Sequence, residues 1–279
     1  MTDRAILACY AHPDDEQGVT GTLFRYGRQG VRTGLLCATR GEAGEISDPA
    51  LATAETLGQV REGELRRAAA LAEIGTLWFL DYRDSGMVGT DPNGDSRAFI
   101  NADSAEAVGR IVRIVREFRP TVLLTFDPTG GYGHPDHLAI NRWTTAAFHA
   151  AGDPAQYPAA GPAWTPSRLY YASFPRSAIK RMLEMIGRDN PNSPLRGVDP
   201  DQMGMPDELI TNVIEVPELV DLKMASLRAH ATQYSPTSPF AQMPEPVMRA
   251  MRSKESFALV AGTPLPADRD RSDLFAGLD

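Results

Sequence analysis

Two short segments of this 279-residue sequence share a pattern that could bind a metal ion. Residues 12–15 read HPDD and residues 134–137 read HPDH. In each segment Pro is predicted at the first position of a helix, where it is favoured. A second donor side chain follows the first His by three residues, and such pairs face the same side of a helical turn. Each segment can therefore direct two donor groups into one cleft.

Three of these side chains predict a zinc site. A catalytic zinc site uses three protein ligands and keeps one position open. His12, Asp15 and His137 would supply two nitrogens and one oxygen, which suits Zn²⁺ and also Fe²⁺. Because His137 lies far from the other two in the sequence, the site forms only if the fold brings distant strand ends together.

The residues left beside this metal could carry out hydrolysis. Asp14 could take a proton from a water molecule whose pKa the metal lowers. A protonated His134 could stabilise an oxyanion and then protonate a departing amine. Asp136 is placed to hydrogen-bond His134 and raise its pKa, and Tyr132 could donate a hydrogen bond to the oxyanion. Together these residues predict metal-assisted hydrolysis of an amide.

Other polar residues are less specific. Glu42 and Asp84 follow predicted strands, and their types fit sugar binding and turn formation equally well. Arg61 could reach the site from the start of its helix, although Arg on a helix is usually solvated. His149, in an amphipathic helix, and His230, near a helix end, favour structural roles.

The first half of the chain alternates strands and helices. Strands are predicted at 6–10, 31–38, 77–80 and 121–126, and helices at 14–29, at 59–74 and from 104 to the residue before Pro120. This alternation predicts an α/β fold whose mostly parallel sheet is covered by helices on both faces. Ligands of such sheets bind at the carboxyl ends of the strands. The segments 12–16, 81–86 and 127–137 all follow predicted strands.

The second half is less regular. Loops are predicted at 152–166 and 187–206, strands at 168–173, 209–215 and 257–260, and a helix at 217–230. The segment from Gly262 is charged and contains Pro, which is typical of a poorly ordered tail. No repeat or linker marks a second unit, so a single domain over residues 1–279 is expected.

Composition excludes several classes of protein. The formal net charge is −8 and the basic residues are scattered, which argues against nucleic-acid binding and against an anionic membrane surface. No apolar run approaches the length of a membrane span, and the amino-terminal residues do not resemble a signal peptide, so a cytoplasmic location is expected. Cys9 and Cys37 lie in apolar runs and are predicted to be small core residues.

The two paired segments, extended to AHPDDE at 11–16 and GGYGHPDH at 130–137, resemble the LmbE/PIG-L deacetylase family. The similarity continues through shorter motifs and spans roughly residues 5–235. These motifs are RGE at 40–42, REGEL at 61–65, YRDSGM at 82–87 and RAHATQ at 228–233. They are most similar to the actinobacterial thiol branch of the family, which includes the deacetylase and the conjugate amidase of mycothiol metabolism.

The resemblance implies a Rossmann-like fold that binds one divalent metal ion, usually zinc. It implies release of acetate from an N-acetylglucosamine-type small molecule. It also implies a role for each matching residue: His12, Asp15 and His137 as metal ligands, Asp14 as general base, His134 as acid or electrostatic stabiliser tuned by Asp136, Tyr132 at the oxyanion, and Arg61 and Asp84 on the sugar hydroxyls, with Glu42 a weaker candidate there.

Several alternatives stay open at this stage. Gln17 and Gly18 depart from the thiol branch near the pocket rim, so the group attached to the sugar could be inositol, malate or another sugar. A thiol S-conjugate amidase would use the same residues with a larger pocket. A nucleotide-binding Rossmann protein is disfavoured because no glycine-rich turn follows the first strand. A non-catalytic metal module is disfavoured because Asp14 and His134 would have no function. Many family members form homo-oligomers, but no surface pattern predicts one here.

Overall fold

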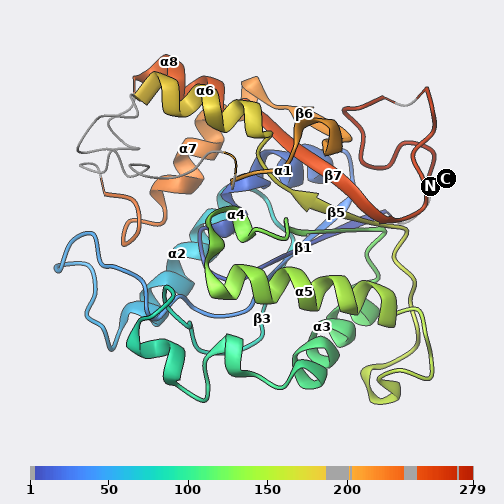
Figure 1. Cartoon of the computed structure of the whole chain (residues 1–279), viewed down its shortest axis with the longest axis horizontal. Coiled ribbons are helices and arrows are strands. Elements are labelled where there is room, and N and C mark those ends of the chain that lie inside the picture. Colours follow the sequence, from blue (N-terminus) through green and yellow to red (C-terminus); the bar gives the residue numbers. More distant parts are fainter. Residues whose placement is uncertain (1–3, 187–200, 202, 236–243, 269, 279) are drawn as a thin grey trace.

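Buried apolar runs form the central sheet of the protein (Figure 1). The computed structural model describes residues 4–186, 201, 203–235, 244–268 and 270–278. All six residues of the first strand are buried, as expected for a strand covered on both faces. The strands are β1 (Ala5–Tyr10), β2 (Arg32–Cys37), β3 (Thr76–Phe79), β4 (Val122–Phe126), β5 (Arg168–Ala172), β6 (Asn212–Glu215) and β7 (Lys254–Gly262).

The order of the strands reverses between two central strands of the sheet. The seven strands lie in the order β3-β2-β1-β4-β5-β7-β6. The first five in this order are parallel, and β7 is antiparallel to both of its neighbours. The chain moves outward from β1 to β3 on one side and then returns to place β4 on the other side. Ligands of open α/β sheets bind where the strand order reverses in this way, here between the carboxyl ends of β1 and β4.

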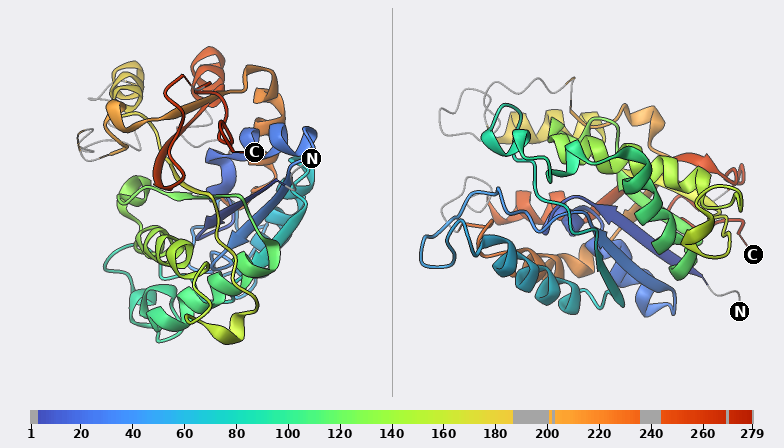
Figure 2. Two further views of the ribbon diagram at one scale, coloured as in Figure 1. Left: turned by 90° about the vertical axis from the view of Figure 1, so that its right-hand side faces the viewer. Right: turned by 90° about the horizontal axis from the view of Figure 1, so that it is seen from below.

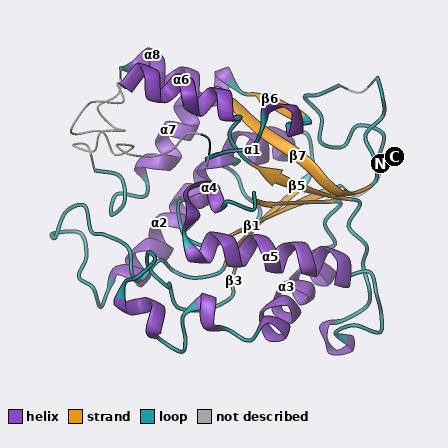
Figure 3. Ribbon diagram, in the orientation of Figure 1, coloured by secondary structure: helices purple, strands orange, loops and turns teal. Residues whose placement is uncertain are grey.

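Helices cover both faces of this sheet (Figures 2 and 3). The helices are α1 (Thr20–Arg28), α2 (Leu57–Leu71), α3 (Ser104–Phe118), α4 (Gly130–Gly133), α5 (Pro135–Ala150), α6 (Arg176–Ile186), α7 (Val220–Arg228) and α8 (Glu245–Arg252). Helices α3 and α5 pack on one face, whereas α1 and α2 pack on the other. Each face of the sheet has its own hydrophobic core: the first lies under α3 and α5, and the second under α1 and α2. Alternate residues of the strands enter these two cores, so Cys9 is buried in the first core and Cys37 in the second. The predicted α/β architecture is therefore confirmed.

The helix predicted over 14–29 is interrupted. A short 3-10 helix (Asp15–Gly18) comes first, and α1 begins only at Thr20. The reason lies in the turn before it, where the backbone N–H groups of Ala11 and His12 both donate to Asp15 Oδ2, at 3.1 and 2.8 Å. These bonds hold the chain in a turn, so the prediction that Pro13 begins a helix is wrong.

The second half differs more from the prediction. Strand β7 is longer than the predicted 257–260 and is inserted between β5 and β6. Helices α6 and α8 were not predicted. Most of the predicted loop at 187–206 lies outside the described residues. Among the described residues, the helices all lack the combination of length and hydropathy that crossing a membrane would require.

The described part of the segment after Gly262 is packed, which corrects the expectation of a poorly ordered tail. Leu274 and Phe275 are buried in the second core. The buried guanidinium of Arg168 donates to four carbonyl oxygens of this segment, those of Thr263, Pro264, Leu274 and Ala276. Arg4 also donates to the Leu278 carbonyl at 2.7 Å, so the two ends of the chain lie side by side (Figure 1).

Candidate metal and active site

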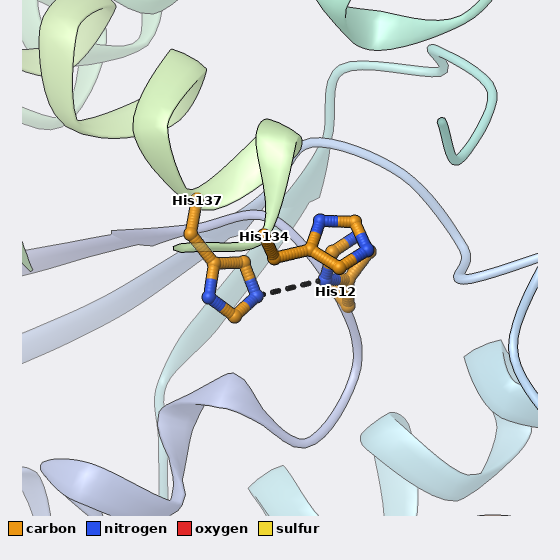
Figure 4. Close-up of side chains that lie close together, drawn as sticks. All are labelled: His12, His134 and His137. Carbon is orange, nitrogen blue, oxygen red and sulfur yellow. Dashed lines mark hydrogen bonds between the residues drawn. The ribbon is translucent and has the colours of Figure 1, made fainter. Parts of the chain in front are cut away.

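The two histidine segments meet where the strand order reverses (Figure 4). His12 leaves the end of β1, and His134 and His137 flank the start of α5, which follows β4. His12 Nδ1 lies 3.1 Å from His137 Nε2. The ring centroids of His12 and His134 are 4.5 Å apart. The fold therefore brings together the two segments, as the sequence predicts.

Asp15 joins His12 and His137 in a compact group of three potential metal ligands, which we call the donor group. Its Oδ1 lies 3.2 Å from His137 Nε2, and its Oδ2 lies 3.5 Å from His12 Nδ1. In a tetrahedral zinc site with bonds of about 2.0–2.1 Å, two donor atoms are separated by about 3.3 Å. The nitrogens of His12 and His137 are 3.1 Å apart, and each lies close to a different oxygen of the Asp15 carboxylate, at 3.5 and 3.2 Å, so the separations are all near that value. This donor set therefore fits a zinc ion in both chemistry and spacing.

Outer hydrogen bonds orient both imidazole rings. His137 Nδ1 lies 2.9 Å from the Gly130 carbonyl oxygen and donates to it, which leaves the Nε2 lone pair facing Asp15. His12 Nε2 lies 3.1 Å from Asp136 Oδ2 and donates to it, which leaves the lone pair of Nδ1 to bind a metal ion. Metal-binding histidines usually have such a partner on the second nitrogen. Phe126 also stacks on the His137 ring, with centroids 4.1 Å apart.

One glycine permits this close approach. Gly130 has φ +61°, and a Cβ atom there would lie 2.7 Å from His137 Cβ. Any larger residue would therefore displace the His137 ring from the donor group.

Two other groups of potential ligands lie beside the first. His134 joins His12 and His137 in one group, and His12, Asp84, His134 and Asp136 form another. We favour the set with Asp15 because its hydrogen bonds from backbone N–H groups fall on Oδ2, which leaves Oδ1 facing His137. In the four-residue group, by contrast, both oxygens of each carboxylate accept hydrogen bonds. Asp84 accepts from two backbone N–H groups, and Asp136 accepts from both the backbone and the hydroxyl of Ser85.

The prediction that the Asp136 side chain hydrogen-bonds His134 is wrong. The carboxylate points toward Ser85 and His12 Nε2 instead. It is the backbone N–H of Asp136 that donates to His134 Nδ1, at 3.2 Å. The Asp136 carboxylate therefore supports His12 directly, whereas it acts on His134 only through its charge, which opposes the lowering of the His134 pKa described next.

His134 caps the amino terminus of α5. Its Nδ1 accepts the Asp136 N–H, so a neutral ring carries its proton on Nε2. Burial, together with the neighbouring His12 and His137, lowers the pKa of His134 to about 4. These surroundings favour a neutral hydrogen-bond donor, whereas the sequence indicated a protonated imidazolium.

Asp14 stands beside the donor group and differs from its neighbour Asp15. Its side chain is 31% exposed, and Arg61 Nη2 lies 3.4 Å from its Oδ1. Desolvation raises the pKa of Asp14 to about 6; the Arg61 charge opposes this shift and the Asp15 charge adds to it. For Asp15, desolvation is outweighed by His137 and His12, which hold its pKa well below the ordinary value. The two adjacent carboxyl groups therefore have opposite pKa shifts.

Tyr132 lies at the rim of the site. It is 59% exposed, and its ring centroid is 5.1 Å from that of His137. Burial of the hydroxyl end, together with the charge of Asp15, raises the pKa of Tyr132, so the group stays a neutral hydrogen-bond donor.

Arg61, predicted to contact sugar hydroxyls, holds the loops around the site. Its guanidinium is buried and donates to the carbonyl oxygens of Gly41, at 2.9 Å, and Pro13, at 2.6 Å. Its Nε is buried and has no hydrogen-bond partner among the described residues. Sugar contact by Arg61 stays a prediction.

Asp84 and Glu42 are linked to each other. Asp84 is 3% exposed and accepts from the N–H groups of Ala43 and Gly86, at 3.1 and 2.8 Å. Glu42 Oε2 accepts from the Asp84 N–H at 3.1 Å. Their contact with sugar also stays a prediction. Glu42 further lines a cavity of ≈ 530 Å³, together with Arg40, Ala54, Glu55, Gly58, Gln59, Glu62 and Arg83.

Three residues at the site were missed from the sequence. Ser85 holds Asp136, and the buried pair Glu16 and His230 lies next to Asp14. Burial lowers the pKa of His230, but the charge and hydrogen bond of Glu16 outweigh this effect and raise it. The third acidic residue of the run at 14–16 was the available signal for Glu16. Spacing alone gave none for His230, because its partner is more than two hundred residues away.

Comparison with known structures identifies a shared fold. N,N'-diacetylchitobiose deacetylase from Pyrococcus horikoshii superposes with a TM-score of 0.66 and 19% identity, over 93% of this chain and 84% of that chain. The conserved protein TT1542 from Thermus thermophilus superposes with a TM-score of 0.61 and 22% identity, over 97% and 100% of the two chains.

Sequence relatives are much closer. A protein of Geodermatophilus obscurus named 1D-myo-inositol 2-acetamido-2-deoxy-alpha-D-glucopyranoside deacetylase is 40% identical, over 99% of this chain and 98% of that protein. A Rhodococcus jostii protein of the same name is 39% identical, over 100% and 99%. The family described as PIG-L, GlcNAc-PI de-N-acetylase, matches residues 7–148, which include both histidine segments. The chain therefore belongs to the PIG-L de-N-acetylase family.

Proposed function

We propose that this protein is a metal-dependent hydrolase that removes the N-acetyl group from an N-acetylglucosamine-containing small molecule. The products are acetate and a free amine. The observation that carries the proposal is the donor group of His12, Asp15 and His137, with Asp14 and His134 beside it. It occurs in a chain that aligns over nearly its whole length with relatives named as deacetylases of such a sugar.

His12, Asp15 and His137 would hold one divalent ion, zinc or iron(II), through two nitrogens and a carboxylate oxygen. When bound, such an ion polarises a carbonyl group and lowers the pKa of water.

Asp14 acts as general base in this proposal. Its carboxylate is partly exposed, and a raised pKa suits a group that must accept a proton near neutral pH. Asp14 takes one proton from the water that attacks the acetyl carbonyl carbon. As the bond from that carbon to nitrogen breaks, the same proton passes to the departing amine nitrogen.

His134 and Tyr132 act on the carbonyl oxygen. The acceptor role of His134 Nδ1 leaves an Nε2–H donor, which stabilises negative charge as it develops on that oxygen. The hydroxyl of Tyr132 adds a second donor from the rim. Neither group needs to change its protonation state during the reaction.

The sugar is proposed to carry a 1D-myo-inositol group, as in the names of the relatives. Arg61, Asp84 and Glu42 would face the sugar hydroxyls. A cytoplasmic location is part of the same proposal.

Acetate release from a panel of substrates tests the proposal. The zinc-loaded protein is incubated with inositol-linked, malate-linked and β-1,4-linked N-acetylglucosamine, and with a bulky S-conjugate of an acylcysteinyl-glucosamine thiol. We expect metal-dependent acetate release that is fastest from the inositol-linked sugar. Cleavage of the S-conjugate without acetate release from any sugar would instead identify an amidase.

A further inference from the structure

Glu16 is a buried carboxylate that the proposed chemistry does not use. It is 1% exposed, and both of its oxygens are occupied. Oε2 accepts the backbone N–H of Asp14 at 3.0 Å. Oε1 accepts from Gln17 Nε2 at 2.6 Å and from His230 Nε2 at 2.8 Å. Glu16 therefore connects the backbone of the proposed general base to a histidine from the other end of the chain.

The backbone of Asp14 needs such support. Its φ of 104° lies in a region that side-chain-bearing residues rarely adopt, and such a conformation persists only where the surroundings hold it. The peptide unit between Pro13 and Asp14 is held at both polar atoms. Arg61 Nη2 donates to the Pro13 oxygen at 2.6 Å, and Glu16 accepts from the Asp14 nitrogen. Because the plane of this peptide sets φ of Asp14, the two bonds determine where the Asp14 carboxylate points.

The other end of the connection is fixed as well. His230 is fully buried just after α7. Two residues later, the N–H and hydroxyl of Thr232 donate to the Glu64 carboxylate, at 2.8 and 2.6 Å. Glu64 and Arg61 both belong to α2. Helix α2 thus holds the Pro13–Asp14 peptide directly through Arg61 and anchors the segment that carries His230.

We infer that Glu16 and His230 are positioning residues, which hold the backbone of Asp14 in its left-handed conformation and so direct its carboxylate to the reacting water. The inference rests on the proposed function, in which Asp14 is the base. Neither residue needs to touch the substrate or the metal.

A double-mutant cycle with Asp14 tests the inference. His230→Gln should lower kcat by about 10- to 100-fold, the range for outer residues that orient a catalytic group. KM and zinc stoichiometry should be unchanged. In an Asp14→Ala background the same substitution should lower kcat no further, because the group that it positions is gone. An equal fold-loss in both backgrounds, or no loss in the wild-type background, would overturn the inference.

The buried pair Lys223 and Glu255 provides a matched control. Glu255 accepts from the N–H groups of Gly21 and Thr22 and from Lys223, and the pair makes no hydrogen bond to Asp14. We expect both Lys223→Met and His230→Gln to lower the thermal midpoint, because each removes one partner of a buried pair, but Lys223→Met should leave kcat unchanged. A comparable fall in kcat for both variants would show that loss of stability alone explains the effect.

Glu16 variants provide a second test that does not depend on His230→Gln folding. Glu16→Gln keeps an oxygen that can accept the Asp14 N–H, whereas Glu16→Ala does not. We expect Glu16→Gln to retain most of the kcat that Glu16→Ala loses. We also expect faster amide hydrogen exchange at Asp14 only in the alanine variant. Equal kcat and equal exchange in the two variants would contradict the inference.

The measurement of amide exchange also distinguishes failure of the proposed function from failure of the positioning role. If the wild-type protein releases no acetate from any substrate, the proposed function fails. Unchanged exchange at Asp14 in Glu16→Ala would refute the positioning role itself, with or without activity.

Discussion

The two histidine segments have nearly the same residues but different backbones. Residues 134–137 form the regular start of α5, with Pro135 as the first helical residue and His134 as its cap. Residues 12–15 form a tight turn, in which Asp14 has φ 104° and the Asp15 carboxylate accepts two backbone N–H groups. The regular segment presents histidines from a rigid helix. The strained segment directs two adjacent carboxylates, Asp14 and Asp15, into different environments.

The largest expected effect distinguishes a histidine that binds the metal from one that only lies beside it. His12→Ala should lose both bound zinc and activity, because it removes a donor nitrogen. His134→Ala should lose activity but keep zinc. Zinc content by atomic emission and acetate release measure both, with exposed His149→Ala as control. Equal zinc loss in the two variants would favour one of the donor groups that include His134.

Within the strained segment, Asp14→Ala should leave zinc binding intact. Turnover should fall by about 10²- to 10⁴-fold, the usual contribution of a general base. Steady-state kinetics on the preferred substrate, with zinc content in parallel, checks this expectation. Near-normal turnover would remove Asp14 from the role of base.

Asp136→Asn tests which segment the Asp136 carboxylate serves. Because that carboxylate faces His12 Nε2, zinc affinity should fall by about 10- to 100-fold. Competition with a chromogenic chelator measures the affinity, and Asp153→Asn, in the half-buried turn after α5, is the control. Unchanged affinity would mean that the Asp136 carboxylate does not support His12 as a metal ligand.

In protein stripped of metal, the adjacent carboxyl groups of Asp14 and Asp15 should have well-separated pKa values. Asp14 has a raised pKa of about 6, so it binds a proton as pH falls through about 6, whereas Asp15 stays ionised at that pH. Carboxyl ¹³C NMR, assigned with Asp14→Asn, follows both groups. Added zinc should lower the Asp14 midpoint, because a nearby cation favours the carboxylate. Coincident midpoints in the stripped protein would contradict the difference between the two environments.

The smallest expected effect is the difference in stability between a glycine and an alanine variant, which should have opposite signs in the two segments. At position 14 the glycine variant should be more stable than the alanine variant by about 1 kcal/mol, because φ is positive there. At position 136, inside α5, the glycine variant should be less stable than alanine by about 0.5–1 kcal/mol. Urea unfolding of the four variants measures both differences. The same sign at both positions would contradict the different backbones of the two segments.

Much of the first half was predictable because its signals are local. The apolar run of β1, the amphipathic pattern of α3 and Pro135 at the start of α5 each reflect neighbouring residues. Helix α8 and the antiparallel insertion of β7 were not predicted. Strand β7 is stabilised by pairing with β5 and β6, and its own residues carry little of that information.

The sequence by itself determined the chemistry that is available: two histidines and a carboxylate of the right types, a spare acid and a spare histidine, and strands that end just before them. Only the tertiary structure decided what each group contacts. It turned Asp136 toward His12, bent the chain at Asp14 and placed His230 against Glu16. Each of these contacts requires its two atoms to be placed to within about one ångström. Such positions result from the packing of α5 on the sheet and of α7 on α2, which no local pattern of residues contains.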